Sequence, residues 1–123
     1  MTKLKITVLK RTVNQDLIDT HMGAESQTAY DFPCPMYEEG QEFISDAWGR
    51  APERFCESAW SDIQKHLHLV RGGGSYPGDW VIPAGAAVAC CTDGYRPVVF
   101  KIELISDEEE AAKSPPSRAK KGA

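Results

Sequence analysis

The sequence predicts an α+β fold, in which a small, mainly antiparallel β-sheet packs against one principal amphipathic helix. Apolar and polar residues alternate over residues 3–10 and again from residue 98 onward, which is typical of strands with one buried face. Between residues 52 and 70, apolar residues recur at steps of three and four, the period of a helix with one buried stripe. A chain of 123 residues with 41% hydrophobic content is long enough for one domain with a modest core.

The first predicted strand spans residues 3–10. Its alternation places Leu4, Ile6 and Val8 on one face, and the polar residues between them on the other. Residues 14–21 follow with a short apolar pair, so that a short helix is expected there. Together these two segments supply the start of the core.

The middle of the chain contains a loop, a short strand and the main helix. Residues 23–35 are expected to form a loop, and residues 42–45 a strand that follows a Glu-Gly turn signal. The main helix is predicted over residues 52–70, because Pro52 suits the first helical turn and the glycines at 72–74 end the pattern.

The last part of the predicted domain is a β-hairpin made of residues 86–91 and 96–105. Asp-Gly at positions 93–94 can supply the positive φ angles of a two-residue type I′ turn. In that register Cys91 lies opposite Arg96. The sheet then has exposed edges, which makes a homo-oligomer or an unknown protein partner plausible.

The hairpin also predicts where its two adjacent cysteines point. Successive strand residues face opposite sides of a sheet, so Cys91 is expected on the core side and Cys90 on the other side. Two adjacent thiols in regular strand geometry do not readily share one metal ion. A bulge at the pair would change this expectation.

Composition limits the domain organisation and the partners. Residues 1–106 are expected to form a single compact domain, and residues 107–123, rich in charge, Pro and Ser, a disordered tail. The four acidic and four basic residues of the tail cancel, so the body carries the full net charge of −4. This acidity argues against nucleic acid. With no apolar stretch long enough for a bilayer or a signal peptide, we expect no membrane association and a cytoplasmic location.

Three groups of motifs together resemble a family of small uncharacterised bacterial and archaeal proteins with a C-terminal Cys-Cys-x-Asp-Gly-x-Arg-Pro-Val-x-Phe-Lys motif. They are Pro-Cys-Pro with Glu-Gly-Gln-Glu-Phe at 33–43, Phe-Cys with Ala-Trp and Asp-Ile at 55–63, and the Cys-Cys hairpin at 90–102. The resemblance covers residues 3–104 and implies a shared cysteine pattern, but no activity. Residues 23–32 and the tail are additions to the compact form of this family, and we expect them to be peripheral.

Four cysteines are the full ligand set of a structural zinc or of a small iron–sulfur centre. The sequence therefore predicts a metal-binding accessory or binding module. Asp62 and Arg96 could pair and support this side of the core. The predicted ligands are Cys34, Cys56, Cys90 and Cys91.

A second interpretation is a thiol-dependent redox protein or enzyme. Cys56 near a helix N-terminus, or Cys91 opposite Arg96, could act as a thiolate, with Cys34 as the resolving partner. In the simplest alternative the cysteines only fill a small core, because free Cys is among the most buried residue types. Whether the protein is an enzyme is left open by these patterns.

A third interpretation is a small-molecule-binding domain in which the cysteines are only structural. The glycine-rich segment at 72–83 is expected to be a long loop, and loops of this length are often functional. Its aromatic residues Tyr76 and Trp80, together with Trp60 of the predicted helix, could cover a pocket.

Overall fold

The computed structural model describes residues 3–46 and 48–105, so the expected tail at 107–123 lies outside the described residues. Four strands form one antiparallel sheet in the order β2-β1-β4-β3, which confirms the predicted α+β class. The two central strands are β1 (Lys3–Arg11) and β4 (Val98–Ile105), and the two edge strands are β2 (Glu42–Ser45) and β3 (Ala87–Cys90).

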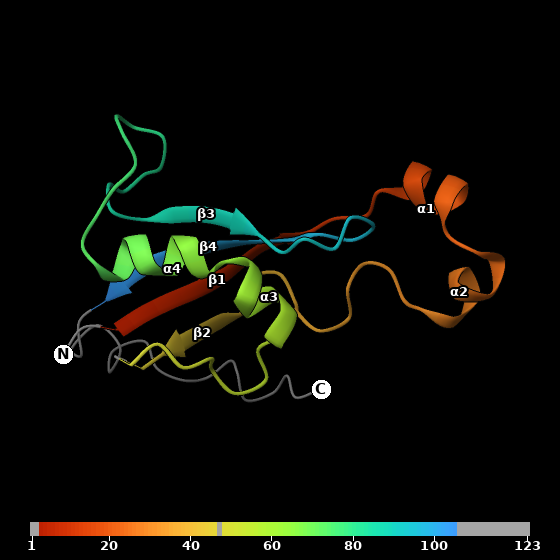
Figure 1. Ribbon diagram of the computed structural model, residues 1–123, viewed down its shortest axis with the longest axis horizontal. Coiled ribbons are helices and arrows are strands. Elements are labelled where there is room, and N and C mark those ends of the chain that lie inside the picture. The colour runs from red at the N-terminus through yellow and green to blue at the C-terminus, as the bar shows by residue number, and fades with distance from the viewer. Residues whose placement is uncertain (1–2, 47, 106–123) are drawn as a thin grey trace.

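One face of the sheet is covered by helices α3 (Glu57–Asp62) and α4 (Gln64–Arg71). Two further helices, α1 (Gln15–His21) and α2 (Ala24–Ala29), project beyond one end of the sheet (Figure 1). No helix of the described part of the chain has the length and apolar character needed to cross a membrane.

The core lies between the sheet and α4. The alternating residues predicted to face inward on β1 and β4 do so, and α4 adds the residues of its apolar stripe. Each of these side chains is at most 1% exposed: Leu4, Ile6, Val8, Val98, Phe100, Ile102, Leu67 and Val70. The predicted period of two therefore identified the buried face of both central strands.

Four aromatic rings pack edge-to-face or tilted at the other end of this core, and we call them the aromatic cluster: Tyr37, Phe43, Phe55 and Phe100. The centroid of the Tyr37 ring lies 5.8, 5.5 and 5.3 Å from those of Phe43, Phe55 and Phe100. Such contacts add stability beyond the area that each ring buries. The cluster joins β2 and β4 to the two loops that contain Tyr37 and Phe55.

The predicted single helix at 52–70 is wrong in its start and in its continuity. Residues 52–55 form a turn in which the Phe55 N–H donates to the Pro52 carbonyl (3.1 Å), and Arg54 has a φ of 71°, which helical geometry does not allow. The helical segment starts only at α3 and is interrupted at Ile63, where ψ is 10°. The predicted apolar stripe still faces the core, because α3 and α4 follow one another on the same side of the sheet.

The predicted hairpin is confirmed, but its two-residue turn is wrong. Ala89 lies opposite Phe100, two residues further along β4 than that turn would place it, and residues 92–97 form the connection. We call residues 92–97 the hairpin loop. Because the shift is an even number of residues, every side chain keeps its predicted face. Cys91 thus points toward the core and Cys90 away from it.

Contacts with a distant segment stabilise the longer hairpin loop. The Asn14 backbone N–H donates to the Tyr95 carbonyl (2.8 Å), and its side-chain amide donates to the Gly94 carbonyl (2.7 Å). Within the loop, the Asp93 carboxylate accepts hydrogen bonds from the Tyr95 N–H (3.1 Å) and from Arg96 Nε (3.0 Å). These bonds satisfy backbone groups that a tight turn would have paired locally.

Helices α1 and α2 form an arm that reaches the hairpin loop. The short helix expected at 14–21 is confirmed as α1, whereas α2 lies in a segment that was expected to be a loop. Helix α2 has no buried residue, and so it shows no apolar stripe in the sequence. Its Gln27 side chain donates to the carbonyls of Ile18 (3.2 Å) and Met22 (2.9 Å), which fixes α2 against α1.

Candidate functional site

The structure separates the four predicted metal ligands into one outer and three inner cysteines. Cys90 is exposed, on the face of the sheet opposite the core. The other three are partly buried and pack against the core from three different segments of the chain. All four are free thiols. We call the three inner residues, Cys34, Cys56 and Cys91, the thiol cluster.

The Tyr37 hydroxyl lies within electrostatic reach of all three inner cysteines. Burial raises the pKa of the Tyr37 phenol, a hydrogen bond from the Cys56 backbone N–H (3.1 Å) lowers it, and negative charge on Cys56, Cys34 and Cys91 raises it further. The net effect is a raised pKa, so this hydroxyl stays protonated at neutral pH. Tyr37 therefore links the thiol cluster to the aromatic cluster.

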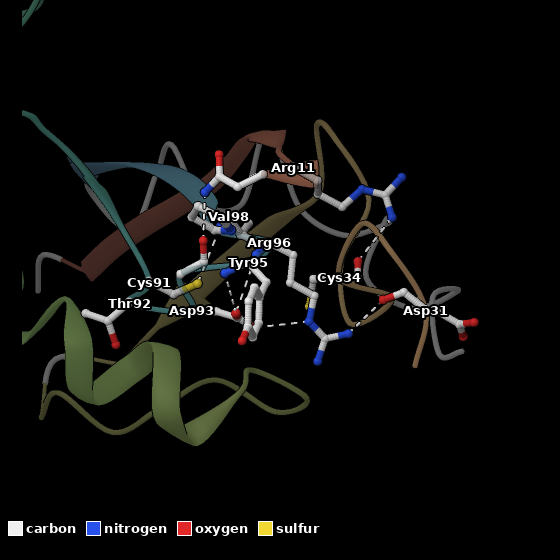
Figure 2. A network of polar contacts seen from close by, with 12 residues as sticks. Arg11, Asp31, Cys34, Cys91, Thr92, Asp93, Tyr95, Arg96 and Val98 are labelled. Carbon is white, nitrogen blue, oxygen red and sulfur yellow. Dashed lines mark hydrogen bonds and ion pairs between the residues drawn. The ribbon is translucent and has the colours of Figure 1, made fainter. Parts of the chain in front are cut away.

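Cys91 makes an unusual contact at the end of β3. Its N–H donates to the Val98 carbonyl (3.1 Å), as in a regular ladder. The returning bond differs, because the Val98 N–H donates to Sγ of Cys91 (3.4 Å) rather than to its carbonyl (Figure 2). A backbone donor directed at sulfur stabilises negative charge that develops there.

Asp62 supports the cysteine side of the core, but it does so without Arg96. Its carboxylate accepts a hydrogen bond from the Thr92 backbone N–H (2.8 Å), directly after Cys91. The possible Asp62–Arg96 pair is thus not formed. Instead, Asp62 connects α3 to the first residue of the hairpin loop and fixes the strand end that carries Cys91.

Arg96 is held by the hairpin loop and by the segment after α2. Its Nε donates to the Asp93 carboxylate (3.0 Å) and its Nη1 donates to the Asp31 carbonyl (2.8 Å), as Figure 2 shows. Its guanidinium also lies over the Phe32 ring, 5.6 Å from the centroid. Partial burial raises the pKa of Asp93, but the hydrogen bonds from Arg96 and from the Tyr95 and Arg96 backbone outweigh this and lower it.

Arg11 holds the loop that carries Cys34. Its Nη1 donates to the Cys34 carbonyl (3.2 Å), as Figure 2 shows. Its Nε donates to the Glu39 carboxylate (3.2 Å). The hydrogen bond from the Arg11 backbone N–H is the main reason that the pKa of Glu39 is lowered. Arg11 is the last residue of β1, so the central strand positions this loop.

The arrangement of the cysteines does not fit the predicted four-cysteine metal centre. Within residues 3–46 and 48–105, no group of three or more His, Cys, Asp or Glu side chains is placed to hold a metal ion. Cys90 faces away from the core, whereas the other three pack against it from three different segments. A zinc or iron–sulfur centre stays a prediction, which metal analysis of anaerobically purified protein tests.

The three aromatic residues of the predicted loop-covered pocket have different surroundings. Trp60 is half-buried, with its ring 5.2 Å from that of Phe55. Tyr76 is half-buried, and its hydroxyl is hydrogen-bonded to Nδ1 of His66. Trp80 is 77% exposed, so its ring lies in solvent instead of covering the other two.

The partial burial of His66 predicts a measurable pH dependence of stability. Burial and, to a lesser degree, Lys65 lower the pKa of His66 in the folded state. The unfolded state, with a His pKa of about 6.5, therefore binds more protons, and folding loses stability as pH falls below that value. Between about pH 7.5 and pH 5.5, we expect chemical denaturation to show a smaller loss of stability in His66→Gln than in the unchanged protein. His68→Gln, at an exposed position of the same helix, is the control, and an unchanged pH slope in His66→Gln would contradict the prediction.

A pocket of about 370 Å³ lies between the arm and the hairpin loop, and we call it the arm pocket. Sequence reasoning missed it, because its walls come from a segment that was expected to be peripheral and from a turn that was expected to be tight. The sequence feature that could have indicated this pocket was Arg96, whose charge requires hydrogen-bonding or ionic partners. The wall residues on which its chemistry depends are His21, Ser26, Tyr30, Phe32, Asp93, Tyr95 and Arg96.

Comparisons of the chain with protein-family models, curated proteins and solved structures found no match.

Proposed function

We propose that the protein is a thiol-dependent redox protein that exchanges with small disulfides through Cys91. The observation that carries this proposal is the hydrogen bond from the Val98 N–H to Cys91 Sγ, at a strand end that Asp62 also fixes. Reactive thiols need partial exposure and donors that stabilise the thiolate, and Cys91 has both.

Cys34 is the better resolving partner for Cys91. Cys56 directly precedes α3, and its backbone is held by the Tyr37 hydroxyl, so it has little freedom to move. Cys34 belongs to a segment without regular secondary structure, in which its carbonyl is held by Arg11. A loop residue can approach a neighbouring sulfur at a lower cost than a residue fixed at a helix start.

The proposed exchange takes place in two steps. The Cys91 thiolate attacks one sulfur of a small disulfide, the S–S bond breaks, and one small thiolate leaves with the bonding electrons. Cys34, after losing its proton to solvent, then attacks Sγ of Cys91 and releases the second small thiol. The small disulfide is reduced to two thiols, and the protein is oxidised to an internal Cys34–Cys91 disulfide.

Glutathione disulfide and intact-mass analysis under denaturing conditions test this proposal. We expect the unchanged protein to form the internal disulfide. Cys34→Ser should accumulate a glutathione adduct on Cys91, and Cys91→Ser should form no internal disulfide. Cys90→Ser is the matched control, because the adjacent thiol is more exposed but faces away from the cluster, and it should react like the unchanged protein.

Two outcomes would overturn this function. One is a protein that acquires glutathione only at Cys90, since simple exposure would then explain the reactivity. The other is an internal disulfide that forms equally well in Cys91→Ser. Peptide mapping of the oxidised protein identifies which sulfurs are joined and so separates these results.

A further inference from the structure

The arm pocket has the size of a small-molecule site. Its volume of about 370 Å³ falls within the range typical of ligand pockets in proteins. Residues far apart in the sequence form it, from α1 and α2 on one side and from the hairpin loop on the other. The hydrogen bonds of Asn14 and of Arg96 hold these two walls together.

Arg96 supplies a fixed positive group in the wall. The Asp93 carboxylate and the Asp31 carbonyl hold its Nε and Nη1, and the Phe32 ring lies against its guanidinium. Among the described residues, its Nη2 group makes no hydrogen bond. A guanidinium fixed in this way presents its remaining N–H groups in a defined direction, and planar carboxylates match that geometry.

The other walls of the pocket are mainly aromatic. The Tyr30 side chain is 58% exposed, although it borders the pocket, and Tyr95 and Phe32 add two further rings. His21 adds an exposed imidazole. The Asp93 carboxylate also lines the pocket, but it is paired with Arg96 Nε (3.0 Å). Flat rings around the remaining N–H groups of that guanidinium and one imidazole suit a planar apolar body with one acidic group.

We propose that the arm pocket binds a small aromatic carboxylate. The carboxylate contacts Arg96 and His21, and the ring system lies between Tyr30 and the hairpin loop. This site is separate from the thiol cluster, whose three cysteines do not line the pocket. It therefore assigns a ligand class to the arm, independently of the proposed redox function.

The pair 2-naphthoate and 2-naphthamide tests both the pocket and its charge preference. The two probes share the same rings, but only the first is an anion. We expect 2-naphthoate to bind with a Kd on the order of 0.1 mM, and the neutral amide at least about tenfold more weakly. In ¹H–¹⁵N NMR spectra, the shifted amides should belong to the arm and the hairpin loop. Equal binding of the two probes, or shifts elsewhere on the protein, would overturn the proposal.

Variants of pocket residues separate binding from folding. Arg96→Gln should weaken 2-naphthoate binding at least about tenfold and remove the preference over the amide. Because this change also breaks the contacts to Asp93 and Asp31, Tyr30→Ala serves as a second variant, at an exposed position whose loss should leave thermal unfolding unchanged. Trp80→Ala is the control, since it removes an equally exposed ring outside the pocket. If Tyr30→Ala and Trp80→Ala both bind like the unchanged protein, the pocket is not the site.

A final comparison distinguishes this site from the redox proposal. Cys91→Ser should bind 2-naphthoate with unchanged affinity, because Cys91 does not border the pocket. Failure of the disulfide exchange together with intact 2-naphthoate binding would remove the redox function and leave the arm pocket standing. The reverse pair of results would remove the pocket alone.

Discussion

Replacing Phe100 by alanine is expected to lower the free energy of unfolding by about 3–5 kcal/mol. Phe100 is fully buried on central strand β4, and its ring contacts those of Tyr37 and Phe55 at centroid distances of 5.3 Å. Truncation removes the apolar area of a whole ring and leaves a cavity. Strand β4 cannot move to fill this cavity, because it is paired with β1 on one side and β3 on the other. Domains of this size have total stabilities of about 5–15 kcal/mol, so the variant should lose a large part of its stability.

Urea denaturation followed by circular dichroism measures this loss. Phe100→Leu is the matched control, because it keeps most of the side-chain volume and should cost less than about 1.5 kcal/mol. A loss below about 1 kcal/mol in Phe100→Ala would contradict the central place given to this ring. In the same variant the three inner cysteines should react faster with an alkylating agent, since they pack against the core that Phe100 and Tyr37 help to form.

The sequence predicted those parts of the fold that depend on local periodicity. Burial of one face forces alternation on β1 and β4, and this pattern can be read without knowledge of any partner. The same alternation predicted the faces of Cys90 and Cys91. This prediction was correct although the predicted hairpin register was wrong, because the register differed by two residues and an even shift keeps each side chain on its face. The start of α3 could not be read in this way. The turn before it depends on a left-handed Arg54, a conformation for which the residue type gives no warning.

The predictions that were wrong concern features that depend on contacts between distant residues. The length of the hairpin loop is set by Asn14, about eighty residues earlier in the chain, so the local Asp-Gly signal was misleading. Arg96 was expected to pair with Asp62 of the helix, but it forms its ion pair with Asp93, three residues away in the sequence. Tyr37 was not noticed at all, because a single tyrosine in an irregular segment carries no pattern. Its role becomes visible only in the folded structure, where its hydroxyl accepts the hydrogen bond from the Cys56 N–H.

Tyr37→Phe tests whether that hydroxyl organises the thiol cluster. The phenyl ring keeps its packing in the aromatic cluster, but the Cys56 N–H loses its acceptor. A donor left without a partner in a partly buried position costs about 1–3 kcal/mol, and we expect a loss of stability in this range. Once its N–H is no longer held, Cys56 should also be alkylated faster than in the unchanged protein.

Tyr30→Phe provides the control, because it removes a hydroxyl from an exposed ring and should change stability by less than about 0.5 kcal/mol. Urea denaturation gives the stability of both variants, and alkylation followed by peptide mapping gives the rate at each cysteine. A faster rate at Cys56 alone would show that the hydroxyl acts through that backbone contact. If Cys34 and Cys91 also became faster, the hydroxyl would hold the cluster as a unit, as its raised pKa and protonated state allow. Stability and alkylation rates that both equal those of the unchanged protein would instead show that Tyr37 only packs in the aromatic cluster and that its hydroxyl does not organise the thiol cluster.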